Sequence, residues 1–146
     1  MIAFCTYCSR QKSAEAGNIP AIRRYQSERI AKVHRVTQEV GVQFLILSGE
    51  FGLLRPEHPI PDYDHLLIAA EVGALAEKLA AQLQSESVSG IVYFTQPFSQ
   101  DPNVVPYHDA LAASCARIQA PFLTVVLNET GLNMDSKELC HRMPNE

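Results

Sequence analysis

Residues 45–64, LILSGEFGLLRPEHPIPDYD, decide the expected fold of this chain. The apolar run 42–47 stops at Ser48 and Gly49, and the loop that follows contains further glycine, several prolines and several carboxylates. A buried strand that ends in such a loop is how open α/β sheets present a ligand site. The loop is longer than the roughly 2–6 residues that usually join a strand to a helix, and such length is usually functional. This stretch therefore predicts a strand with a binding site at its carboxyl end.

Strand and helix patterns alternate on both sides of this stretch. Apolar segments rich in β-branched and aromatic residues predict strands at 2–7, 42–47, 91–95 and 121–127. Apolar residues at helical spacing predict helices at 19–40, 65–86, 104–119 and beyond 135. Asn18 and Asp64 are the expected N-caps of the first two helices, and Gly41 ends the first one. Right-handed crossovers turn this order into a three-layer α/β/α sandwich with a four-stranded, mainly parallel sheet.

The composition fits one globular α/β domain formed by residues 1–146. Hydrophobic residues make up 47%, and the net charge of −4 argues against gross affinity for nucleic acid. The first 55 residues, however, contain eight Lys and Arg, four Glu and no Asp, so a basic amino-terminal third can face an anionic ligand. No apolar run is long enough to span a membrane, and residues 1–5 have the pattern of a strand and not of a signal peptide. A cytoplasmic protein is expected.

Four cysteines, Cys5, Cys8, Cys115 and Cys140, are expected to be reduced thiols. The Cys5-x-x-Cys8 spacing also occurs in zinc and dithiol sites, but no second pair follows at metal-ligand spacing. The glycines of a Walker A loop or of a Rossmann fingerprint are missing as well. The sequence therefore predicts neither a metal nor a cofactor.

Polar side chains follow each predicted strand, and parallel strands bring such loops to one edge of a sheet. The converging loops are residues 8–12, 48–64, 95–96 and 128–131. Ser9 and Lys12 offer a hydroxyl, an ammonium group and backbone amides to a phosphate, a carboxylate or a polar base edge. Tyr25, one helical turn before Arg29, would reach toward Lys12 if the first helix faces this edge, although packing is the default explanation for it.

The central loop carries candidate acids, bases and an anion clamp. Glu50 and Asp64 can serve as a general base or orient water or a nucleoside hydroxyl. Asp64 is explained equally by its predicted role as a helix N-cap. Arg55 can clamp an anion, or it can form an internal ion pair with Glu57 or Glu50.

Ser48, Gly49, Gly52 and Tyr63 complete the candidate ligand site in this loop. The Gly-x-Ser-x-Gly pattern of a hydrolase nucleophile is absent, so Ser48 is expected to be a hydrogen-bond donor at the strand end. The two glycines let backbone amides approach a ligand closely. Tyr63 can stack on a ring or donate a hydrogen bond, and it can equally fill the space beneath the loop.

These residues resemble two known families. Cys8-Ser9-x-x-Lys12 is similar to a motif in the core domain of archaeosine synthase. Ser48-Gly49-x-x-Gly52-Leu53-Leu54-x-Pro56 resembles the central segment of the YaaA-type peroxide-stress family and is the most specific part of the likeness. Three further parts of the chain look like members of the same pattern, namely Ile60-x-x-Tyr63-Asp64, Tyr107 ahead of a helix, and Thr130-Gly131-Leu132.

The resemblance implies an α/β fold linked to nucleic acids or modified nucleobases. Archaeosine synthase adds lysine to a deazaguanine nitrile in tRNA, and YaaA-like proteins bind DNA and limit oxidative damage. The matching ligand residues would be Cys8, Ser9, Lys12, Ser48, Gly49, Gly52, Pro56, Tyr63 and Tyr107. This chain is shorter than YaaA, and no Pro-Tyr follows Lys12 closely, so the lysine-transfer signature is incomplete.

Three functions follow as hypotheses. The first is binding of a nucleotide, nucleobase or nucleic-acid-derived ligand at the carboxyl-terminal strand edge, with base-modification or glycosidic-bond chemistry as the reaction class. The second is a non-catalytic DNA- or RNA-binding stress-response module that uses the basic first helix, including Arg23 and Arg24. The third is a structural domain that binds a partner protein. Catalysis itself and the oligomeric state are left open.

Overall fold

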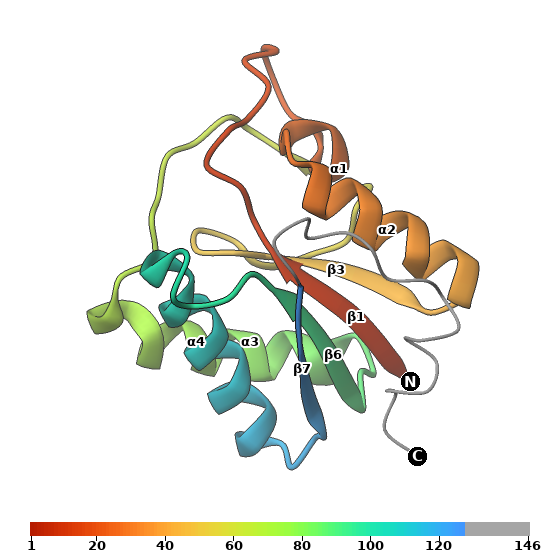
Figure 1. The fold of residues 1–146 in the computed structure, drawn as a ribbon, viewed down its shortest axis with the longest axis vertical. Helices are drawn as coiled ribbons and strands as arrows, with labels where there is room; N and C mark the ends of the chain where they lie inside the picture. The colour runs from red at the N-terminus through yellow and green to blue at the C-terminus, as the bar shows by residue number, and fades with distance from the viewer. Residues whose placement is uncertain (128–146) are drawn as a thin grey trace.

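The computed structural model describes residues 1–127, which contain a five-stranded sheet with helices on both faces (Figure 1). The strands in sheet order are β4 Gly52–Leu54, β3 Gln43–Ser48, β1 Ile2–Tyr7, β6 Gly90–Thr95 and β7 Phe122–Val126. The helices are α1 Ala21–Arg24, α2 Glu28–Val40, α3 Val72–Ser85 and α4 Val105–Arg117. Shorter elements are strands β2 Ile19–Pro20 and β5 Pro59–Ile60 and the 3-10 turns η1 Ala69–Glu71 and η2 Pro102–Val104. The α/β class is confirmed.

The parallel part of the sheet follows the predicted strand order. β1 pairs in parallel with β3 and with β6, and β6 pairs in parallel with β7. The prediction of four strands was wrong in one respect, because β4 adds an antiparallel edge strand to β3. Gly52, at a φ of 76°, lets the chain turn back directly after Ser48, with which it pairs. A strand of three residues is too short to show a period-two pattern in the sequence.

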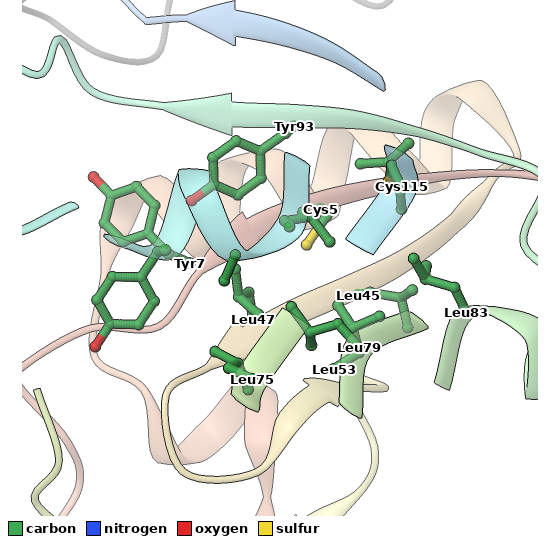
Figure 2. Packing of buried hydrophobic residues seen from close by; sticks show 14 of the residues in the cluster. Cys5, Tyr7, Leu45, Leu47, Leu53, Leu75, Leu79, Leu83, Tyr93 and Cys115 are labelled. Carbon is green, nitrogen blue, oxygen red and sulfur yellow. The ribbon is translucent and has the colours of Figure 1, made fainter. Parts of the chain in front are cut away.

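Alternating side chains of the strands bury two separate clusters, one on each face of the sheet. On one face Cys5 and Tyr7 of β1 pack with leucines of β3 and α3 and with Cys115 of α4, as Figure 2 shows. On the other face Phe4 packs with Ile30 of α2 and with alternate residues of β3 and β6. Each large side chain buried in this way contributes about 1.5–3 kcal/mol from the transfer of its surface out of water. The two faces give the α/β/α layering.

The predicted first helix, 19–40, is divided into two. β2 pairs with β5, α1 forms a single turn, and Tyr25 then takes an extended conformation and bridges to Lys12. α2 begins afresh at Ser27, whose side chain accepts a hydrogen bond from the N–H of Ile30. Ser27 is therefore the N-cap in place of Asn18. Gly41 ends α2 at a φ of 84°, as the sequence predicted.

The predicted start of the second long helix was wrong by about two turns. α3 begins at Val72, directly after η1. The Glu71 side chain accepts from the N–H of Ile68 at 3.1 Å and so caps the start of η1, whereas Asp64 caps neither η1 nor α3. Residues 61–68 form no helix because they run across the edge of the sheet: Ile60 belongs to the apolar cluster on the α2 face and Leu67 to the cluster on the α3 face. Figure 1 shows this crossing segment, residues 61–68, as a yellow-green arc that leads from the α1 side to α3.

The basic first helix is mostly engaged in internal contacts. Arg24 is fully buried and donates to the carbonyl oxygens of Ser13, Glu15, Gly17 and Ile60. Arg23 forms an exposed ion pair with Glu15 at 2.7 Å. Neither arginine therefore offers the free cation that the sequence predicted for a nucleic-acid surface.

Some expected features lie outside the described residues, namely the helix beyond 135, Cys140 and the loop 128–131. Within residues 1–127 no helix has the length and apolar character needed to cross a bilayer.

Candidate functional site

A cavity of about 750 Å³ lies at the carboxyl ends of the parallel strands. One wall comes from the loop after β1 and the start of α2, with Cys8, Ser9, Arg10, Lys12, Ser27, Glu28 and Arg29. The other walls come from the crossing segment, the loop after β6 and the start of α4, with Asp64, His65, Leu66, Gln96, Asp101, Asn103 and Tyr107. The predicted convergence of strand-end loops is therefore present for the loops that follow β1 and β6.

The strand order explains why a cavity forms there. β1 and β6 are neighbours, but the loop after β1 leads to α2 on one face and the loop after β6 leads to α4 on the other. Loops that diverge from adjacent parallel strands leave a crevice between them, and ligands of open α/β sheets bind at this topological switch point. The space is called the switch-point cavity below.

Arg29 is the most buried cation of the cavity, with 9% of its surface exposed. Its Nη1 donates to Thr6 Oγ1 and to the carbonyl oxygen of Tyr7, and its Nη2 donates to the carbonyl oxygen of Cys8. The guanidinium also lies 3.6 Å from the centre of the Tyr7 ring. Burial lowers the pKa of Arg29, because removal from water disfavours the charged form. No carboxylate within residues 1–127 forms an ion pair with it.

Lys12 and Tyr63 lie together, in agreement with the predicted convergence of loops 8–12 and 48–64 at one edge of the sheet. Lys12 Nζ is 4.6 Å from the centre of the Tyr63 ring and 5.9 Å from that of Tyr25, and it donates to the carbonyl oxygen of Arg10 at 3.3 Å. The two rings meet edge to face with their centres 6.3 Å apart. The aromatic pair thus holds the ammonium group at the cavity wall by cation–π attraction.

A chain of three hydroxyl groups lies beneath Lys12. Ser48 Oγ accepts from the N–H groups of Glu50 and Phe51, both at 3.1 Å, and therefore donates its proton to Tyr63 Oη at 2.8 Å. Tyr63 Oη is in turn 2.5 Å from Tyr25 Oη. Burial raises the pKa of both tyrosines, so they stay protonated at neutral pH. The chain ties the crossing segment to the end of β3. Ser48 is fully buried and does not line the cavity, so the predicted contact between Ser48 and a ligand is not present.

Cys8 and Tyr107 both line the cavity, and the Tyr107 hydroxyl lies close to Gly49. Tyr107 Oη accepts from the N–H of Leu67 at 3.1 Å, and burial raises the pKa of its phenol. A Cβ at Gly49 would lie 3.2 Å from Leu67 Cβ and 3.3 Å from Tyr107 Oη, so glycine is needed for the close approach of these segments. Gly49 therefore allows two segments to pack closely below the cavity. The sequence had predicted that Gly49 contacts the ligand directly, but it does not line the cavity.

His65 of the crossing segment lies between two carboxylates, those of Glu50 and Glu71. His65 Nδ1 lies 2.5 Å from Glu50 Oε2, and its Nε2 lies 2.9 Å from Glu71 Oε2. Hydrogen bonding to Glu50 and then to Glu71 raises the pKa of His65, and the same contact with His65 lowers the pKa of Glu71. His65 lines the cavity, whereas Glu50 is exposed and engaged by His65.

Comparisons of this chain with protein families, with curated proteins and with solved structures found no match. The resemblance to archaeosine synthase and to YaaA-type proteins stays a prediction.

Several predicted site residues lie elsewhere. Arg55 directly follows β4, at the end of this strand that is farther from Ser48. It forms an exposed ion pair with Glu86, so neither Glu57 nor Glu50 is its partner. Gly52 faces Gln82 of α3, whose Oε1 a Cβ would approach to 2.3 Å. Ser9 and Asp64 do line the cavity, and Ser9 donates to the carbonyl oxygen of Gln11 at 2.7 Å.

Sequence reasoning gave too little weight to four cavity residues, Arg29, His65, Gln96 and Asn103. Arg29 has the signature of an ordinary charged helix face, and only its place in the first turn of α2 could have indicated the strand edge. His65 follows Asp64 directly, so the proximity to the predicted acids was its only signal. Gln96 and Asn103 flank a loop after a predicted strand, which is the position where ligand contacts are expected.

Proposed function

We propose that this protein binds a nucleotide or a nucleobase-derived ligand in the switch-point cavity. One observation carries the proposal: Lys12 and Arg29 line the same cavity and have no carboxylate partner within residues 1–127. Cations that lack a counter-ion in a cleft with low-dielectric walls attract an anionic ligand.

The remaining walls suit the rest of such a ligand. Gln96 and Asn103 offer amide groups that can read the polar edge of a base or a ribose hydroxyl. Tyr7 and Tyr107 also line the cavity, where their largely buried rings pack against each other with their centres 6.2 Å apart. The volume of about 750 Å³ falls within the range of roughly 300–1,000 Å³ that is common for small-molecule sites.

If the protein is an enzyme, Asp64 and His65 are the groups best placed to move protons. Both line the cavity, and Asp64 makes no hydrogen bond within residues 1–127. Glu50, the other candidate from the sequence, does not line the cavity and acts instead as a partner of His65. Base-modification or glycosidic-bond chemistry would therefore use Asp64 as the acid–base group and His65 with Glu50 behind it.

The alternative of a nucleic-acid-binding module has less support. It relied on the basic first helix, but Arg24 is buried among carbonyl oxygens and Arg23 is neutralised by Glu15. Lys32 and Arg35 of α2 remain without a carboxylate partner within residues 1–127. Two isolated cations supply little of the multi-phosphate contact that non-specific binding needs.

A ligand screen tests the proposal directly. The melting temperature of the protein should rise with at least one member of a panel of nucleobases, nucleosides and nucleoside phosphates, since ligands that bind the native state stabilise it. Lys12→Ala should abolish or weaken the shift, whereas Arg35→Ala, an exposed cation on α2 outside the cavity, should leave it unchanged.

Two results would oppose the proposal. A panel that produces no shift at saturating concentration would exclude this ligand class. Oligonucleotide binding that Arg35→Ala weakens and Lys12→Ala does not would favour the nucleic-acid alternative.

A further inference from the structure

We infer that the ligand is a nucleoside monophosphate, with its phosphate held by Arg29, Lys12 and the first turn of α2. This inference rests on the proposed function and narrows its ligand from the whole class to the phosphorylated members. It also assigns each end of the ligand to a wall of the cavity.

The guanidinium of Arg29 has hydrogen-bond donors that no group within residues 1–127 accepts. Of its five N–H groups, three donate to Thr6, Tyr7 and Cys8, so the Nε–H and one Nη2–H make no hydrogen bond within residues 1–127. The side chain is nine-tenths buried and lines the cavity, so these donors are available only at the cavity surface. A buried charge without a counter-ion is costly. A phosphate oxygen pair would satisfy both donors and the charge at once.

Two further groups converge on the same wall. Lys12 Nζ uses one donor on the carbonyl oxygen of Arg10, which leaves two for a ligand. Ser27 caps α2 through the N–H of Ile30, and the N–H groups of Glu28 and Arg29 make no hydrogen bond within residues 1–127. Free amides at the start of a helix of 13 residues add partial positive charge where a phosphate would lie.

The rest of the cavity differs in chemistry from this wall. Tyr7 separates the two regions, because Arg29 lies over its ring while its hydroxyl donates to Gln96 Oε1 at 3.2 Å. Gln96, Asn103 and Asp101 follow β6 and present amide and carboxylate groups. An anion is disfavoured beside Asp101, so a monophosphate would place its phosphate toward Arg29 and its base or ribose toward Gln96 and Asn103.

Glu28 is the acid that opposes this arrangement. It lies in the first turn of α2 and lines the cavity beside Arg29. Its charge repels a phosphate, so Glu28→Gln should tighten phosphate binding by about twofold to fivefold. The same change should leave the affinity for an uncharged nucleoside within about twofold.

Titration calorimetry with matched ligands tests the inference. The four ribonucleosides and their 5′-monophosphates are titrated into the full chain, and inorganic phosphate is added as a competitor. We expect at least one monophosphate to bind about tenfold or more tightly than its own nucleoside, which is the gain from charge-assisted hydrogen bonds. Inorganic phosphate should compete with the monophosphate.

Variants place the phosphate on the predicted wall. Lys12→Ala should weaken the affinity for the monophosphate by about tenfold and the affinity for the nucleoside by less than about twofold. Arg35→Ala is the matched control and should change neither. Arg29→Lys keeps a buried cation but loses the paired N–H donors of the guanidinium group. It should therefore weaken the affinity for the monophosphate more than the affinity for the nucleoside. Because Arg29 also bridges strand ends, the Lys12 result is decisive if Arg29→Lys does not fold.

The outcomes separate this inference from the proposed function. Equal affinity for a nucleoside and its monophosphate, or equal loss of both in Lys12→Ala, would overturn the phosphate assignment and leave the proposed function standing. Binding of 5′-phosphorylated oligonucleotides without any mononucleotide would overturn it too. A failure of every nucleoside and monophosphate to bind would overturn the phosphate assignment, and it would overturn the proposed function as well if the nucleobases and the other nucleoside phosphates of the panel also fail to bind.

Discussion

Replacement of Tyr63 by phenylalanine tests how the crossing segment is held over the site. The variant keeps the ring that contacts Lys12 and removes one hydroxyl, the middle member of the chain from Ser48 to Tyr25. Ser48 is fully buried and Tyr25 is 4% exposed, so water cannot replace the lost partner of either.

The expected cost follows from those contacts. Two hydrogen bonds are lost, each worth about 0.5–1.5 kcal/mol, and two buried hydroxyls are left without a partner for one of their groups. The free energy of unfolding should fall by about 2–3 kcal/mol. For a chain of this size that corresponds to a melting temperature lower by roughly 6–12 °C.

Urea and thermal denaturation measure the effect, and Tyr93→Phe provides the control. The Tyr93 hydroxyl is buried and has no hydrogen-bond partner within residues 1–127, so its removal should be neutral or stabilising. A Tyr63→Phe variant as stable as the parent would refute the hydroxyl chain. Equal losses in both variants would refute it as well, because they would show that any buried phenol matters alike.

Three further predictions concern the parts that surround the cavity. Gly49→Ala should lower the free energy of unfolding by about 1–2 kcal/mol, because the new Cβ would lie 3.2 Å from the buried Leu67 side chain. Gly73→Ala should raise the free energy of unfolding by about 0.5–1 kcal/mol, because a Cβ at this helix position meets nothing within 4 Å. Urea denaturation measures both. Arg24→Ala should cost about 3 kcal/mol, and Arg23→Ala, an exposed ion pair, less than about 1 kcal/mol; equal costs in the same denaturation assay would contradict the burial argument. The two flanking glutamates raise the pKa of His65 above 6.5, so its contribution to stability is fully present below pH 6.5 and is lost as pH rises through the folded value. An NMR titration that places this pKa below 6.5, or a His65→Gln variant whose stability deficit grows at high pH, would contradict the arrangement.

The parallel sheet and the meeting of Lys12 with Tyr63 could be predicted from the sequence. Strands of five or six apolar residues have an unmistakable pattern, and chain order together with right-handed crossovers fixes which loops share an edge. Lys12 belongs to the loop after β1, and Tyr63 belongs to the long segment after the neighbouring strand β3, which also contains β4 and β5. The order of strands places these segments at one edge of the sheet, and the hydrogen bond between Tyr63 and Ser48 returns Tyr63 to the end of β3.

The errors arose where distant contacts override local signals. Asn18 and Asp64 have good capping side chains, but Ser27 and Glu71 make the capping hydrogen bonds instead. The bridge between Lys12 and Tyr25 moves the start of α2 to a later residue. The crossing of the sheet edge by residues 61–68 does the same for α3. Arg29 resembled a solvated charge because a helix face shows no sign of which strand end it will cover. The partner of Arg55 is 31 residues away, and no local pattern identifies Glu86.

The most direct test of the switch-point cavity is backbone NMR during titration with a nucleoside monophosphate. We predict that the largest shifts will occur at amides of Ser9, Lys12 and Arg29, with Gln96 in the same set, while Gln38 and Gln43 near the amino ends of the strands stay unchanged. Shifts concentrated around Gln38 and Gln43, or no shifts at saturating ligand, would contradict the placement of the site.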